Sequence, residues 1–142
     1  MPASLEGCVV VADELVRWGD QDAFGHVNNT VYFRYFETVR IAYFERIGFA
    51  AAAGVGPILA STSCRFRRPL RYPDRLRAGA FVSALGDDRL AMQYVVWSEA
   101  LGDVAATGEG LVVAYDYGAA RKCPLPAAVR AAIVGLQPSL AG

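Results

Sequence analysis

Carboxylate, imidazole and amide side chains gather in one stretch of the sequence, DQDAFGHVNNTVYFRYFE at residues 20–37. An ionised carboxylate such as that of Asp22 can attack a carbonyl carbon or take a proton from water. The asparagine pair precedes a run that looks like a helix, and a helix start offers unpaired N–H groups with a partial positive charge of about half a unit. Those groups suit a developing oxyanion. The stretch therefore supplies an activated oxygen and an oxyanion donor together.

Three other titratable side chains lie in the same stretch. His26 is the only histidine of the chain and no cysteine lies near it, so no metal site is expected. Three roles for His26 stay open, namely orienting water, binding substrate and holding the loop. Asp20 is interpreted as a turn or capping residue. Glu37 lies three residues from Arg34 and from Arg40, which favours an ion pair and leaves Glu37 a minor catalytic candidate.

A second candidate segment, CRFRRPLRYPDRLR at residues 64–77, holds six of the fourteen basic residues and one acid, Asp74. Arginine side chains match the geometry of phosphate groups. Thirteen of the fourteen basic residues are arginine, so their abundance alone does not indicate a ligand. We expect at least one of Arg65, Arg67 and Arg68 to contact a phosphate.

Composition limits the class of protein. The chain has 142 residues, 54% of them apolar, which predicts one folded domain over residues 1–142. Fourteen basic and fourteen acidic side chains cancel, so neither nucleic acid nor a membrane is an expected partner. No apolar run approaches the ~18 residues of a membrane span, and no signal peptide is expected. Cys8, Cys64 and Cys123 are far apart, which fits packing thiols in the cytoplasm.

The elements that would position these residues can be predicted from hydrophobic spacing. A strand is predicted over residues 8–18. Apolar residues spaced by three and four predict a helix over residues 30–47, with an N-cap at Asn28 or Asn29 and a stop at Gly48. Strands are predicted over 58–66, 76–84, 90–96 and 104–117, with turns at GDD and LGD. A short helix over 124–136 would carry Pro126 in its first turn.

This order of elements predicts one sheet around one apolar helix, an α+β architecture. It resembles the hotdog fold. The stretch RWGDQDAFGHVNNTVYFRYFE resembles the signature of the 4-hydroxybenzoyl-CoA thioesterase-like acyl-CoA thioesterases, and its D-x-x-G-H-V-N-N-x-x-Y core carries most of the specificity. The order of elements resembles that family from about residue 17 to residue 136, including a YPDRL turn and a proline near the end of the last strand.

The resemblance implies an acyl-CoA thioesterase whose only cofactor-like group, CoA, is part of the substrate. It places Asp22 on the catalytic carboxylate and Asn29 where a backbone N–H polarises the thioester carbonyl. We assign His26 to catalysis as an assisting group, and Asn28 and Tyr32 to substrate binding, with the Tyr32 ring lining an acyl pocket. Family sites lie at a dimer interface, and one small sheet can scarcely cover this much apolar surface, so we expect a homodimer or homotetramer.

Two alternatives use the same fold. Hotdog hydratases and dehydratases acting on acyl-CoA typically place the histidine and the carboxylate on different segments, whereas here both lie within DAFGH. A non-catalytic acyl-CoA sensor would require a dispensable Asp22 carboxylate. The sequence contains neither a G-x-S-x-G motif nor a phosphate-binding loop, so other hydrolase classes and nucleotide hydrolysis are not expected. The sequence does not indicate the acyl group.

Overall fold

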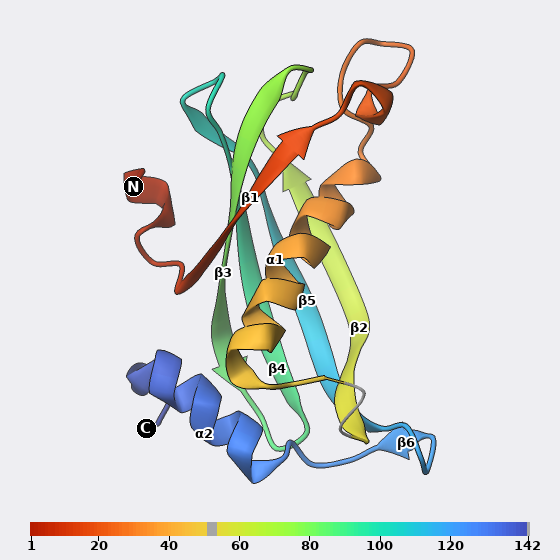
Figure 1. Ribbon diagram of the computed structural model, residues 1–142, viewed down its shortest axis with the longest axis vertical. Helices are drawn as coiled ribbons and strands as arrows, with labels where there is room; N and C mark the ends of the chain where they lie inside the picture. The colour runs from red at the N-terminus through yellow and green to blue at the C-terminus, as the bar shows by residue number, and fades with distance from the viewer. Residues whose placement is uncertain (51–53, 142) are drawn as a thin grey trace.

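The protein forms an antiparallel sheet that curls around one long helix (Figure 1). The structure is a computed structural model that describes residues 1–50 and 54–141. The predicted α+β hotdog architecture is confirmed. Within those residues no helix has both the length and the apolar character that a membrane crossing requires.

The sheet has the strand order β1-β3-β4-β5-β2, and every neighbouring pair is antiparallel. Its strands are β1 (Val10–Val16), β2 (Val55–Phe66), β3 (Asp74–Leu85), β4 (Arg89–Ser98) and β5 (Asp103–Asp116). The predicted strands and both turns are confirmed, although β2 begins at Val55 rather than at residue 58. The short strand β6 (Arg121–Lys122), which pairs with β5, has too few residues to produce a recognisable pattern.

The long helix α1 (Val31–Ile47) packs across one face of the sheet and buries the predicted apolar side. Two glycines of β5 allow this close approach, because a Cβ at Gly108 would collide with the Phe36 ring and one at Gly110 with the Tyr94 hydroxyl. The rings of Phe36 and Tyr94 stack with their centroids 4.9 Å apart. The predicted stop is confirmed, since Gly48 has a φ of 69°, which favours glycine.

The second helix, α2 (Ala127–Leu136), closes the end of the sheet that lies far from the start of α1 (Figure 1). Pro126 is the N-cap of α2, so its predicted place in the first turn is wrong by one position. The Gln137 side chain accepts from Val82 N at 2.9 Å and donates to Val82 O at 2.8 Å. Because β1 no longer pairs with β3 at that point, the Gln137 amide serves as a strand partner. The 3₁₀ helices η1 (Ala3–Leu5), η2 (Trp18–Asp20) and η4 (Pro138–Ala141) were not predicted.

The crossing between β2 and β3, residues 67–73, supports the loop that precedes α1. Val27 N donates to Leu70 O at 2.8 Å, and Tyr72 N donates to the Gln21 side chain at 3.2 Å. Leu70 is fully buried. These bonds bring the arginine-rich segment and the acidic loop, far apart in sequence, side by side.

Candidate active site

The loop that carries Asp22 is a tight turn closed by its own backbone. Asp22 N donates to His26 O at 2.9 Å, and Gly25 N donates to Asp22 O at 3.0 Å. Gly25 has a φ of 77°, a conformation that a side chain disfavours, so glycine is required here. Among residues 1–50 and 54–141 the Asp22 side chain accepts from Phe24 N alone, at 2.9 Å, and it is exposed. The carboxylate is therefore fixed in direction yet open to solvent and ligand.

The start of α1 differs from the predicted capping arrangement. Thr30 is the N-cap, so the assignment of the cap to Asn28 or Asn29 is wrong. Asn28 lies two residues before this N-cap and holds it in place. Its side-chain oxygen accepts from Thr30 N at 2.9 Å and from the Thr30 hydroxyl at 2.8 Å. The Asn29 N–H has no acceptor among residues 1–50 and 54–141. An exposed, unpaired N–H thus remains at the positive end of the helix dipole.

A hollow of about 340 Å³ gathers most of the predicted site residues. Its lining comes from the loop, from the first turn of α1 and from the crossing after β2. Six of the eight predicted residues line it, namely Asp22, His26, Asn29, Tyr32, Arg67 and Arg68. Asn28 does not line the hollow but bonds to Thr30, and Arg65 lines a separate groove. The arrangement places a carboxylate and a free N–H in one cavity, as acyl transfer requires.

His26 is in contact with an arginine that the sequence did not single out. Arg71 Nη2 lies 3.1 Å from His26 Nε2. A guanidinium group has only donors, so a hydrogen bond between these two atoms needs the His26 tautomer that accepts at Nε2 and carries its proton on Nδ1. The sequence places Arg71 in the basic segment 64–77, which is the feature that could have indicated it. Its contact with His26 was not predictable, because it depends on how residues 67–73 fold beside the loop.

The apolar part of the hollow comes from aromatic side chains. Tyr32 is 2% exposed and meets the ring of Phe66 edge-on, with centroids 4.9 Å apart. Burial raises the pKa of Tyr32, so its hydroxyl stays protonated at neutral pH. Phe24, which is 86% exposed, and Phe66 also line the hollow and were not predicted. Tyr32, Phe24 and Phe66 give the hollow an apolar surface.

The three predicted phosphate-binding arginines separate in the structure. Arg65 pairs with Thr107, and the neighbouring pair of Cys64 with Gly108 faces the helix, so Arg65 points to the opposite face of the sheet. It lines a separate polar groove, which Arg67 also reaches. Arg68 forms an exposed ion pair with Asp103 at 3.3 Å. Arg67 therefore lies at the rim of the hollow with the least neutralised charge.

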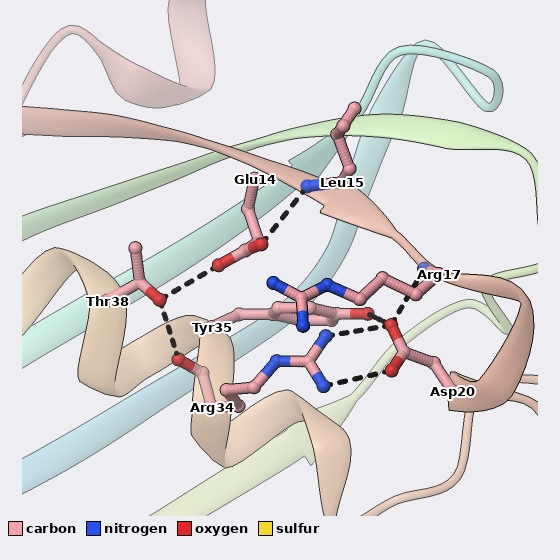
Figure 2. Close-up of polar contacts among 7 residues, drawn as sticks. All are labelled: Glu14, Leu15, Arg17, Asp20, Arg34, Tyr35 and Thr38. Atoms are coloured by element: carbon pink, nitrogen blue, oxygen red, sulfur yellow. Dashed lines mark hydrogen bonds and ion pairs between the residues drawn. The ribbon is translucent and has the colours of Figure 1, made fainter.

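The other predicted acids have structural partners. Asp20 is 5% exposed, caps η2 by accepting from Arg17 N, and forms a two-bond ion pair with Arg34 (Figure 2). Its interpretation as a capping residue is confirmed. The ion pair predicted for Glu37 is confirmed, and in the described part of the chain its partner is Arg40, at 3.9 Å, rather than Arg34. The reason is that Asp20, on the loop, reaches Arg34 with better geometry than a helix neighbour can.

Two other features bear on ligands. A groove of about 710 Å³ lies over β1 and β3, lined by side chains such as Leu15, Arg77 and Trp97, and contains none of the predicted site residues. In the described part of the chain, no three His, Cys, Asp or Glu side chains gather as a metal site would need. The hollow beside Asp22 is thus the cavity that combines the candidate groups.

Comparisons with known proteins agree with this fold. Residues 16–133 match the model of the thioesterase-like superfamily. A thioesterase from Thermus thermophilus, solved with coenzyme A and zinc, is 34% identical, with a TM-score of 0.83 over 94% of this chain and 98% of that one. The PA5185 protein from Pseudomonas aeruginosa is 28% identical, with a TM-score of 0.84 over 94% of each chain.

A curated relative is matched over a shorter length. Protein YsmA of Bacillus subtilis is 35% identical over 81 residues, which is 56% of this chain and 55% of YsmA. The alignment thus spans about half of that relative. The superfamily model, in contrast, covers the loop, α1 and the strands from β2 to β6. The chain belongs to the thioesterase-like superfamily.

Proposed function

We propose that the protein hydrolyses an acyl-CoA to the free acid and CoA. One observation carries the proposal, namely that Asp22 and the unpaired Asn29 N–H line the same hollow at the start of α1. The coenzyme A bound to the Thermus thioesterase supports CoA as the thiol part of the substrate. The reaction would need water and acyl-CoA alone, with no separate cofactor.

The chemistry divides between the two groups. In one route, Asp22 takes a proton from water while the water oxygen bonds to the acyl carbon, the C–S bond breaks and the thiolate leaves. In the other, an Asp22 oxygen bonds to the acyl carbon, the C–S bond breaks and the CoA thiolate leaves, and water then hydrolyses the resulting anhydride to free acid and Asp22. In both routes the Asn29 N–H donates to the oxyanion that forms on the carbonyl oxygen.

His26 and the arginines would assist at either end of the substrate. With Nε2 occupied by Arg71, the Nδ1–H of His26 can donate to a water molecule or to the substrate. We expect Arg67, and more weakly Arg68, to contact the phosphates of CoA. Tyr32 and its aromatic neighbours would hold the acyl group.

We also propose that the working form is a homodimer, which could double to a tetramer. Strand β2 is an edge strand with exposed apolar residues, Ile58 and Leu59 at 39% each and Phe66 at 43%. Ile41 on α1 is 49% exposed. Exposed edges and apolar surface of this kind favour pairing with a second copy. The three cysteines are free thiols, which supports a cytoplasmic location.

The decisive variant is Asp22→Asn, which keeps the acceptor for Phe24 N and removes the charge. The fold should survive and turnover should fall by about 10²- to 10⁴-fold. Asp116→Asn is a matched control, because Asp116 also accepts an amide two residues ahead and lies outside the hollow. Near-normal turnover of folded Asp22→Asn would contradict the proposed mechanism. Wild-type protein that binds acyl-CoA without turnover would instead indicate a sensor.

Heavy-oxygen water separates the two routes. In a single turnover, attack by Asp22 followed by hydrolysis at the acyl carbon of the anhydride would put the label in the acid product, whereas hydrolysis at the Asp22 carbon would put it in Asp22. Direct attack by water always labels the acid product. Label in Asp22 would therefore establish the covalent route. Its absence, with no acyl-enzyme trapped by rapid quenching, would favour general-base catalysis.

A further inference from the structure

The Asp20 carboxylate is saturated with donors and cannot itself act on a substrate. It accepts from Arg34 Nη1 at 2.9 Å, Arg34 Nη2 at 2.8 Å, Arg17 N at 2.8 Å and the Tyr35 hydroxyl at 3.3 Å (Figure 2). Three of these donors meet Oδ2 and one meets Oδ1, so both oxygens of the carboxylate are engaged. The Asp20 side chain is also 6% exposed, so substrate has no access to it.

The backbone of Asp20 is engaged at the same time. Asp20 O accepts from Asn28 N at 2.9 Å, which closes the loop between the two residues. Inside that closure Gln21 pairs with Val27, and Asp22 N bonds to His26 O. Asp20 therefore fixes the base of the loop, with Asp22 two residues after it and Asn29 directly after the closing residue.

Arg34 connects this base to the first turns of α1. Its guanidinium makes two bonds to Asp20, and its Nε is buried with no partner among the described residues. The Thr38 hydroxyl lies 2.8 Å from a Glu14 carboxylate oxygen of β1 and 3.1 Å from Arg34 O, and its single O–H is within donating distance of both acceptors, which links the pair to the sheet (Figure 2). Two-bond guanidinium–carboxylate pairs set orientation as well as distance. The loop and the helix start are thus held as one unit.

We propose that the Asp20–Arg34 pair is a positioning device that sets the Asp22 carboxylate against the Asn29 N–H. The proposal rests on the function proposed above. Within the described residues the Asp22 carboxylate bonds to Phe24 N alone, so its own turn fixes its direction, and the base of the loop at Asp20 sets where that turn stands relative to the start of α1. Misplacement of a reacting group by about 1 Å can reduce the rate 10²-fold.

The test compares two buried aspartates. Asp74 is 8% exposed and bonds to Ser98 and to Ala100 N, outside the hollow, so Asp74→Asn is a matched control for Asp20→Asn. We expect both variants to lose stability. Only Asp20→Asn should also lose turnover, with kcat about 10- to 100-fold lower and KM within about threefold, because contacts with CoA remain.

Arg34→Lys keeps the charge and removes the two-bond geometry, so an intermediate kcat is expected. If Asp20→Asn does not fold, the kcat of Arg34→Lys tests the proposal in its place. If the folded variants keep kcat within twofold of the Asp74→Asn value, the pair is only structural and the proposal is wrong.

Hydrogen exchange provides a reading that needs no activity. The Asp22 and Asn28 amides should exchange about tenfold faster in Asp20→Asn than in Asp74→Asn. A wild-type protein without thioesterase activity would refute the proposed function, and faster loop exchange would still support the positioning role. Unchanged exchange would overturn it.

Discussion

Removal of the Arg67 charge tests how the protein would recognise CoA. Arg67 is exposed at the rim of the hollow, whereas Arg68 is partly neutralised by Asp103. A hydrogen bond between charged groups contributes about 1.5–3 kcal/mol, and solvent screening favours the lower end for an exposed side chain. A loss of about 1.4 kcal/mol corresponds to a tenfold weaker interaction. Arg67→Ala should therefore raise KM for acyl-CoA about tenfold and leave kcat unchanged.

The matched control is Arg65→Ala, which removes the same charge two residues earlier on the opposite face of β2. We expect its KM to change less than twofold. The assay is steady-state release of free thiol from an acyl-CoA and from the same acyl group on pantetheine, which lacks the nucleotide. The Arg67→Ala effect should shrink as salt rises, because the screening length is about 8 Å at 0.15 M.

Equal losses of Arg67→Ala on both substrates would contradict this reasoning and indicate a role in folding. An Arg65→Ala effect as large as that of Arg67→Ala would show that CoA runs along the outer groove instead. The acyl-group panel in the same assay, from short to long and aromatic, would identify the substrate class.

Three more outcomes are expected. Light scattering at micromolar concentration should give the mass of a dimer or tetramer, and a monomer would refute the oligomer proposal. Gly108→Ala should reduce the free energy of unfolding by about 1–3 kcal/mol because the new methyl group collides with Phe36, whereas Gly135→Ala, in open space on α2, should raise it by up to about 1 kcal/mol. Denaturant titration that finds both changes neutral would contradict the packing described for α1. Burial would raise the pKa of Asp20, but bonds from Arg34 and Arg17 N and the Arg34 charge outweigh it and hold the pKa below its usual value. The stability advantage of wild type over Asp20→Asn should thus be full above about pH 4 and shrink as pH falls further, as measured by thermal unfolding. A gap independent of pH between 6 and 2 would contradict this linkage.

Local patterns predicted the parts of the site that depend on local geometry. The turn from Asp22 to His26 closes within five residues and requires Gly25, so the motif alone indicates it. The helix face was predictable because apolar spacing follows the helical repeat. The N-cap residue was harder to predict than the helix itself, because a side chain can bond to a backbone amide of the first turn without being the N-cap. The Asn28 side chain accepts from Thr30 N in this way, although Thr30 is the N-cap.

Features that depend on distant contacts were not predictable. Alternation along a strand would put Arg65 and Arg67 on the same face. Strand β2 ends at Phe66, and both Arg67 N and Arg68 N donate to Ala105 O, so the alternation stops there and Arg67 reaches the hollow as well as the groove that Arg65 lines. Arg34 likewise has a helix neighbour of opposite charge within range, yet its partner comes from fourteen residues earlier. Spacing rules predict contacts between side chains of one helix or strand. They do not show whether a carboxylate from another part of the chain, such as Asp20, makes a better partner.

The motif therefore divides into two kinds of residue. Asp22 and Asn29 are exposed and make few contacts, so substitutions there should change turnover while the fold persists. Asp20 and Val27 are buried, and Gly25 has a positive φ, so substitutions there should affect stability and turnover together. A family signature that contains both kinds identifies the reaction through the exposed residues and its geometry through the buried ones.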